Sequence, residues 1–185
     1  MITLLLLAGA VAAVQPTKAD VAAAAPATSW KCARTPQDAP EKCIEDFEGI
    51  DATIHEVYEV ISGPPGQKRD FDKMRSLFAP GATLKAIGPK GLRGGSLEDY
   101  ISRNKDVLER DGFTERELGR RVEVWGGLAT AWSSYDGRTA NGSFHERGIN
   151  SFQLVKIDGK WLVASILWQE ETPENPLPLD LVPKK

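Results

Sequence analysis

A long amphipathic helix is predicted just after residue 45, because hydrophobic residues there recur every three or four positions. The residues with this spacing are Phe47, Ile50, Ile54, Val57 and Ile61. The helix should stop at the Gly- and Pro-rich segment 62–66, since proline cannot continue a helix. A shorter helix is predicted from about Asp70. A third should start at Ser96, where Ser96 and Asp99 have the spacing of a capping box, and should end at Gly112.

From residue 113 onward the pattern changes to long strands. The four runs are Phe113–Trp125, Leu128–Arg138, Arg147–Ile157 and Lys160–Glu170. The dipeptide Asp158-Gly159 between the last two is a strong hairpin signal. Two shorter strands, 82–87 and 92–95, are predicted before the third helix. Helices followed by a meander of antiparallel strands predict an α+β fold rather than alternating βαβ units.

The last long run has hydrophobic residues on both alternating faces. Trp161, Val163 and Leu167 share one parity, while Ile166 and Trp168 belong to the other. Both faces of the sheet should therefore be covered, one of them by the helical layer. The other cover is either a second subunit or the C-terminal tail, and a homodimer through the convex sheet face is the simpler expectation.

The first residues are typical of a secretory signal. Residues 2–14 are almost entirely apolar, and this run is too short to span a bilayer as a helix. Small residues lie at positions suited to signal cleavage, in 10–12 and again in 22–24. A buried N-terminal helix is the alternative, although the segment has no polar face. We expect a secreted or periplasmic protein whose mature form has no membrane span.

The chain has two cysteines, Cys32 and Cys43, close together in a polar, Pro-containing stretch. In an oxidising compartment such a pair would close a short loop, worth on the order of 3 kcal/mol in the chain-entropy model. No His lies near them, which disfavours a metal site. The pair is therefore predicted to be a structural disulfide.

Composition excludes several functional classes. The chain has 185 residues, is 41% hydrophobic and carries a net charge of −3, so it can bury one good core and has no basic surface for nucleic acid. It contains no phosphate-binding Gly-rich loop and no Gly-x-Ser-x-Gly elbow. Its two histidines lack metal-ligand spacing. No cofactor and no metal are expected.

The order of elements resembles the nuclear transport factor 2-like superfamily. The motifs that carry the resemblance are the segment 72–82, with Leu-Phe-Ala-Pro-Gly-Ala at its end, and Asp158-Gly159-Lys160-Trp161. The resemblance covers about residues 46–171. It implies a curved antiparallel sheet wrapped around N-terminal helices to form a cone-shaped pocket. Proteins of this superfamily, which includes ketosteroid isomerase-like and polyketide cyclase-like members, are often dimers and often bind small apolar molecules.

Four residues are candidates for acid–base chemistry in such a pocket. His55 could be a general base, or a boundary residue bonded to Glu59 one turn later. Tyr58 could donate a hydrogen bond to a ligand, or belong to the core. Glu117 and Arg121 share one strand parity and could lie at the pocket mouth or form a surface ion pair. The resemblance transfers no complete catalytic set to these positions.

Six further residues are candidates for ligand contact: Tyr100, Trp132, Tyr135, Asn150, Gln153 and Trp168. Trp132 and Tyr135 lie on opposite faces of one strand, so the pattern leaves open which face lines the pocket. Asn150 and Gln153 are polar amides in an apolar strand and would be either ligand anchors or satisfied core amides.

Four segments follow from these patterns: a signal 1–24, a linker 25–45 with the Cys32–Cys43 disulfide, the domain 46–171 and a proline-rich extended tail 172–185. The expected function is binding of a small apolar or amphipathic molecule without turnover. The alternatives are a cofactor-independent lyase, isomerase or hydrolase, and a purely structural domain with a filled cone.

Overall fold

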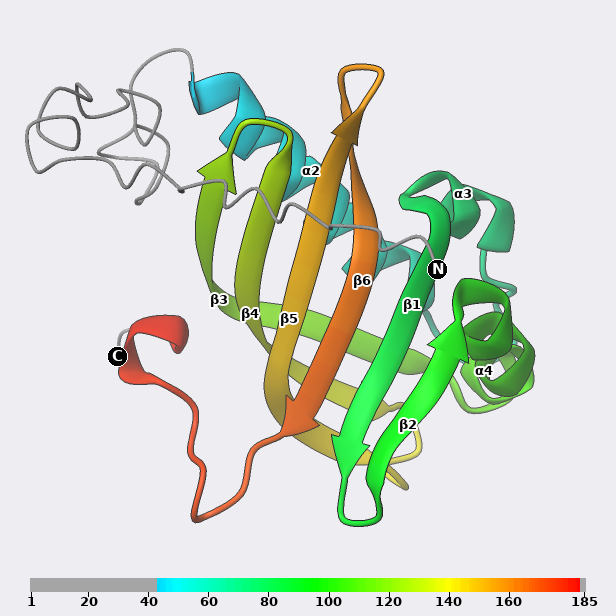
Figure 1. Cartoon of the computed structure of the whole chain (residues 1–185). Coiled ribbons are helices and arrows are strands. Elements are labelled where there is room, and N and C mark those ends of the chain that lie inside the picture. Colours follow the sequence, from blue (N-terminus) through cyan, green and yellow to red (C-terminus); the bar gives the residue numbers. More distant parts are fainter. Residues whose placement is uncertain (1–42, 184–185) are drawn as a thin grey trace, which may run out of the picture.

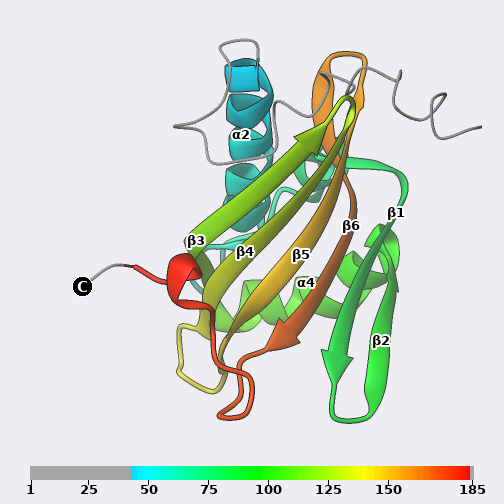
Figure 2. The ribbon, with the colours of Figure 1, turned by 60° about the vertical axis from the view of Figure 1, so that its left-hand side comes forward.

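The fold is one curved sheet with helices packed against its concave face. The computed structural model describes residues 43–183. Figure 1 and Figure 2 show α2 (Ile44–Ile61) and α4 (Leu97–Asp111) on the same side of the sheet. The strands are β1 (Phe78–Gly88), β2 (Gly91–Ser96), β3 (Phe113–Trp125), β4 (Leu128–Thr139), β5 (His145–Ile157) and β6 (Lys160–Glu170). The predicted α+β fold is confirmed.

The sheet is mixed rather than wholly antiparallel. Its strand order is β2-β1-β6-β5-β4-β3, and β1 pairs with β6 in parallel. The chain leaves β2 through α4 and enters the sheet again at the opposite edge, as β3. The meander β3 to β6 then runs back across the sheet until β6 lies beside β1. A pattern of local hairpins contains no information on this long-range pairing.

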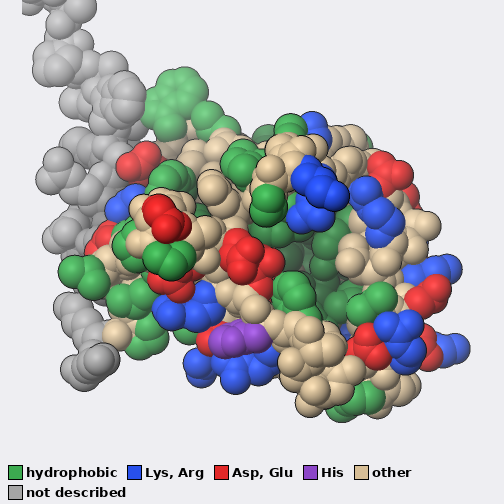
Figure 3. Space-filling model, turned by 90° about the horizontal axis from the view of Figure 1, so that it is seen from below, with side chains coloured by type: hydrophobic (Ala, Val, Ile, Leu, Met, Phe, Trp, Pro, Cys, Tyr) green, Lys and Arg blue, Asp and Glu red, His purple; other side chains and the backbone are tan. Residues whose placement is uncertain are grey.

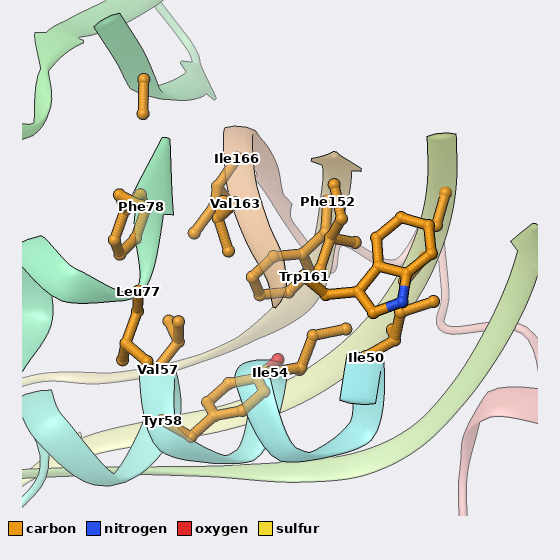
Figure 4. Packing of buried hydrophobic residues seen from close by; sticks show 14 of the residues in the cluster. Ile50, Ile54, Val57, Tyr58, Leu77, Phe78, Phe152, Trp161, Val163 and Ile166 are labelled. Atoms are coloured by element: carbon orange, nitrogen blue, oxygen red, sulfur yellow. The ribbon is translucent and has the colours of Figure 1, made fainter. Parts of the chain in front are cut away.

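Helix α2 forms the floor of the main hydrophobic core. Its Ile50 and Ile54 side chains are fully buried, and Val57 and Tyr58 are nearly so. Figure 4 shows these side chains pointing toward Phe152 and other residues of the sheet. Each large apolar side chain buried in this way contributes about 1.5–3 kcal/mol. The predicted apolar stripe is therefore what fixes α2 to the sheet.

The two other helices begin and end where side-chain capping predicts. Helix α3 (Phe71–Ser76) starts after Asp70, which accepts a hydrogen bond from the Lys73 amide at 2.8 Å. Ser96 and Asp99 form the capping box at the start of α4. Gly112 ends α4 with φ +64°, and a Cβ there would lie 2.6 Å from the backbone of Pro65. Both the conformation and the close approach require glycine.

Two β-bulges change which side chains face the helices. In β3 the register shifts between Glu117 and Gly119, so Glu117 and Arg120 face the concave side while Arg121 faces the convex side. In β6 the register shifts at Ala164, between the pairs that Val163 and Ser165 make with β5. The strict alternation assumed for these strands is therefore wrong.

The bulge in β6 corrects the argument that both sheet faces carry equivalent apolar rows. Trp161 and Val163 before the bulge, and Ile166 after it, are all buried on the concave side. Leu167, on the convex side, is 39% exposed. β6 therefore has fewer apolar side chains on the convex face than the sequence pattern indicated. The apolar residues there do not by themselves require a second subunit.

The C-terminal segment folds back against the sheet instead of extending away from it. It contains a short 3-10 helix, η3 (Leu179–Leu181), that contacts β3. Leu181 is fully buried, its carbonyl oxygen accepts a hydrogen bond from Ser134, and Asp180 pairs with Arg121 at 2.8 Å. A Cβ at Gly119 would lie 2.8 Å from the Leu181 oxygen, so glycine permits this approach. Part of the convex face is thus covered by the chain's own tail.

Some predictions lie outside the described residues. The signal segment 1–24 and Cys32 belong to this group, so the disulfide with Cys43 stays a prediction. Cys43 itself is fully buried beside the start of α2. Among residues 43–183, no helix is long and apolar enough to cross a membrane.

Candidate functional site

A pocket of about 540 Å³ opens between α4, the β1–β2 hairpin and the β4–β5 loop. This volume falls in the range of small-molecule sites. Figure 3 shows the hollow from below, with hydrophobic side chains inside it. Its apolar walls come from helices and sheet alike and include Val57, Ile61, Leu84, Phe113, Phe152 and Trp168. A filled, purely structural cone therefore does not describe this chain.

Two glutamates, Glu115 and Glu146, place carboxyl groups in this largely apolar pocket. Both pair with Gly137, which lies between them on β4, so the two side chains share one row of the concave face. Gly137 has no side chain to separate them. Neighbouring strands lie about 4.8 Å apart, so the two backbones are on the order of 10 Å apart. Long Glu side chains from such positions can both reach one ligand.

Burial raises the pKa of Glu115 to about 7. An amide hydrogen bond from Asn150, 3.0 Å from Oε1, opposes this rise, whereas the nearby charge of Glu146 adds to it. Burial also raises the pKa of Glu146, against the effects of a hydrogen bond from Tyr135 and the charge of Arg93. A carboxyl that titrates near neutral pH can give or take a proton under physiological conditions.

A chain of hydrogen bonds fixes Tyr58 at the inner wall. Ser133 donates its single hydroxyl proton to the carboxylate of Glu117, so it must accept from Tyr58, 2.7 Å away. Tyr58 in turn accepts from the Asn150 amide at 3.1 Å. The proton of Tyr58 is therefore used within the protein, and burial raises its pKa further above the ordinary value. Tyr58 orients Asn150 rather than donating to a ligand.

The other two tyrosines of the pocket differ from Tyr58. The Tyr135 hydroxyl donates to Glu146. The Tyr100 hydroxyl has no hydrogen-bond partner among the described residues and remains available to a ligand. Burial raises the pKa of both, so both are neutral donors at pH 7.

The structure brings together half of the residues predicted from the sequence. Five of them line the pocket: Tyr58, Tyr100, Tyr135, Asn150 and Trp168. Their positions make ligand contact possible, and their roles stay predictions.

The other predicted site residues lie elsewhere. His55 is on the exposed side of α2, away from the pocket. Trp132 and Gln153 belong to the convex face, where Trp132 is 43% exposed and Gln153 accepts a weak hydrogen bond from Thr130. Arg121 is also convex, because the bulge in β3 reverses its side, and its guanidinium stacks over Trp132. These four side chains face away from the pocket.

Glu117 faces the concave side but does not line the pocket. It pairs with Arg120 at 3.1 Å, and Arg120 also approaches Asp51 at 3.3 Å. Arg120 thus lies between two acids, and the predicted partner Arg121 is not part of this group. This group belongs to the structural support of the inner wall, through the bond from Ser133 to Glu117.

Sequence reasoning missed Glu115 and Glu146. The signal was present, because Glu115 has the parity of Glu117 before the bulge and Glu146 has the parity of Asn150. Both look like ordinary surface glutamates in a charged strand. Only their closeness to α4 and to each other marks them. Within residues 43–183, no group of three or more His, Cys, Asp and Glu is arranged to hold a metal ion.

Comparison with known proteins supports the fold. No family model matches the sequence, and no curated protein matches it. A solved protein with a cystatin-like fold from Nostoc punctiforme is 18% identical, with a TM-score of 0.55, covering 72% of this chain and 96% of that one. A proposed dehydratase of the nuclear transport factor 2-like family from Streptomyces avermitilis is 14% identical, with a TM-score of 0.54, covering 69% and 96%.

A third similar structure is a proposed scytalone dehydratase from Novosphingobium aromaticivorans. It is 11% identical, has a TM-score of 0.55, and covers 76% of this chain and 93% of that one. The resemblance seen in the sequence is confirmed at the level of fold: this chain has the nuclear transport factor 2-like cone. At these identities the likeness does not extend to a reaction.

Proposed function

We propose that this protein binds a small, mostly apolar molecule in the cone and moves a proton on it with Glu115, as a cofactor-independent lyase or isomerase. The observation that carries the proposal is a half-buried carboxyl group that lines a largely apolar pocket, where burial raises its pKa to about 7. Asn150 holds one of its oxygens at 3.0 Å, which leaves the other for the ligand. Burial, orientation and a pKa near the working pH are what general acid–base catalysis requires.

The second carboxyl group gives the site a complementary partner. Glu146 lies across Gly137 from Glu115, and its charge raises the pKa of Glu115. Two interacting carboxyls in one apolar site favour a state in which one is protonated and the other ionised. The ionised group can take a proton from carbon while the protonated group gives one to a leaving hydroxyl or to a carbonyl oxygen. A dehydration or a double-bond shift balances in this way without a cofactor.

Proton exchange in D2O tests the proposal without knowledge of the substrate. The full chain is incubated with a panel of small cyclic ketones and β-hydroxy ketones, and loss of the α C–H signal is followed by NMR. We expect exchange on some panel members, slowed by roughly 100-fold or more in Glu115→Gln. Glu48→Gln, on the exposed side of α2, is the matched control. No exchange by the wild type, or equal rates in Glu115→Gln, would contradict proton transfer by Glu115.

Binding without turnover is the second candidate. It is favoured by the commitment of the Tyr58 proton to Ser133, which removes one donor that a reaction could use. Native mass spectrometry of the purified chain would reveal a retained ligand. A ligand that is recovered unchanged after incubation, with no proton exchange, would support this candidate over the enzyme.

Export, the Cys32–Cys43 disulfide and a homodimer are further proposals. The apolar run in residues 2–14 supports export, and exposed Leu128, Trp132 and Leu167 on the convex face support a dimer there. Expression of the full chain in a bacterial host, followed by cell fractionation and intact mass under non-reducing conditions, tests export and the disulfide. Light scattering tests the dimer. A cytosolic, uncleaved and reduced monomer would contradict all three.

A further inference from the structure

The mouth of the pocket carries two arginines that the proposed chemistry does not use. Arg93 on β2 and Arg103 on α4 both line it. Neither forms a salt bridge with any residue that the structure describes, whereas most other arginines of this region do. Two guanidinium groups that line one opening from the neighbouring elements β2 and α4 are well suited to an anionic group of a ligand.

The position of Arg93 is set by the sheet. Arg93 pairs with Ala86, which pairs with Trp168, so the three residues form one row on the concave face. The guanidinium of Arg93 lies over Gly88, where an added Cβ would be 3.0 Å from Nη2. Its charge also reaches the interior, because it lowers the pKa of Glu146. Arg93 is therefore an oriented wall residue of the mouth.

Arg103 is held in place by a backbone contact within α4, the helix that packs beside β2. Its Nε donates to the backbone oxygen of Asp99 at 3.0 Å, and this bond leaves both terminal nitrogens for another acceptor. Asp111, which also lines the pocket, is already paired with Arg110 at 2.6 Å. Among the charged residues that line the pocket, Arg93 and Arg103 are therefore the cations without an ion pair, while the exposed Glu170 lies beside Glu146 near the end of β6.

We propose that the ligand is a small amphipathic organic acid, with its anionic group bound between Arg93 and Arg103 and its apolar body against Trp168 and Phe113. This inference rests on the proposed function, because it assigns the substrate class of the same pocket. The polar group that reacts would then lie at Glu115, and the anion at the mouth would fix which carbon faces that carboxyl. The apolar wall between the two polar ends matches the uncharged part of such a molecule.

A matched pair of fluorescent dyes tests the anion requirement. 8-Anilinonaphthalene-1-sulfonate and N-phenyl-1-naphthylamine share one ring system and differ in the sulfonate group. Full-length wild-type protein is titrated with each dye, and the ratio of the two Kd values is measured. We expect the sulfonate dye to bind about tenfold more tightly than the uncharged dye. This factor is at the lower end of the range for hydrogen bonds to charged groups, because both arginines are exposed.

Four variants test whether the two arginines and the pocket are responsible for this preference. Arg93→Gln and Arg103→Gln should each remove most of the preference for the sulfonate, whereas Lys105→Gln, the same charge change on the outer side of α4, should preserve it. Ala86→Trp fills the pocket from β1 and should abolish binding of both dyes. Circular dichroism melting confirms that each variant is folded.

The outcomes separate this inference from the proposed function. Equal affinity of the wild type for the two dyes, or a preference that both arginine variants retain, would overturn the inference and leave the pocket proposal standing. Dye binding that survives in folded Ala86→Trp would place the dye outside the cone and would also overturn it. If neither dye binds the wild type, both the small-molecule pocket and this inference are contradicted.

Discussion

The concave and convex faces of the sheet differ more than the alternation of residues along its strands suggests. Both faces are built from the same strands, yet the concave face buries Phe152 completely while Trp132, one strand away on the convex face, is 43% exposed. Carboxyl groups follow the same division. Glu115 on the concave face is half-buried and burial raises its pKa to about 7, whereas Asp180 of the tail over the convex face forms a solvent-exposed ion pair with Arg121. Chemistry depends here on which side of the strand a residue faces, and less on which residue it is.

The largest expected contrast between the faces concerns stability. Phe152→Ala removes a fully buried ring from the concave face and should lower the free energy of unfolding by about 3–5 kcal/mol, from lost burial and the cavity left behind. Urea unfolding followed by circular dichroism measures the change. A loss under about 1 kcal/mol would mean that the concave core is not packed as described.

The second contrast depends on pH. A carboxyl whose pKa is raised on folding contributes its full stability below the unfolded value of 4.5 and loses it as the pH rises through about 7. The free energy of unfolding of Glu115→Gln, relative to that of the wild type, should therefore increase between pH 5 and pH 8, by on the order of 2 kcal/mol. Glu48→Gln controls for net charge. An advantage that stays constant with pH would show that Glu115 titrates as an ordinary surface acid.

A third test concerns the hydrogen-bond chain of the inner wall. Tyr58→Phe leaves Ser133 without its donor and one Asn150 proton without its acceptor, and should cost about 1–2 kcal/mol. Tyr100→Phe, which removes a hydroxyl without a partner in the described residues, should change stability by less than about 0.5 kcal/mol. Equal costs for the two variants, measured by thermal unfolding, would contradict the distinction between a structural and a free hydroxyl.

The smallest expected effect is on the convex face. Trp132→Ala removes a half-exposed ring that the guanidinium of Arg121 stacks over, and should lower the free energy of unfolding by less than about 1 kcal/mol. Light scattering of the same variant sharpens the comparison. If the wild type is a dimer through this face, the Trp132→Ala dimer should already dissociate at a higher protein concentration than the wild-type dimer. An unchanged dimer would place the interface elsewhere.

Much of the fold was predictable because local signals determine it. The apolar stripe of α2, the capping box of Ser96 and Asp99, and the Asp158-Gly159 turn each act over a few residues, and each is confirmed. The pocket could be predicted only in part. Tyr58, Tyr100 and Asn150 line it as proposed, whereas His55 and Arg121 do not.

The sequence by itself determined the elements and their order, since periodicity and turn chemistry depend on neighbouring residues. The cone was expected only from the resemblance carried by the motifs in 72–82 and 158–161. Only the tertiary structure decided the parallel pairing of β1 with β6, the bulges in β3 and β6, and the closeness of Glu115 to Glu146. A bulge reverses every side chain after it, and a pKa depends on burial and on charges from distant strands. Neither has a local signature, and the burial and long-range charges are what turn two ordinary glutamates into a candidate site.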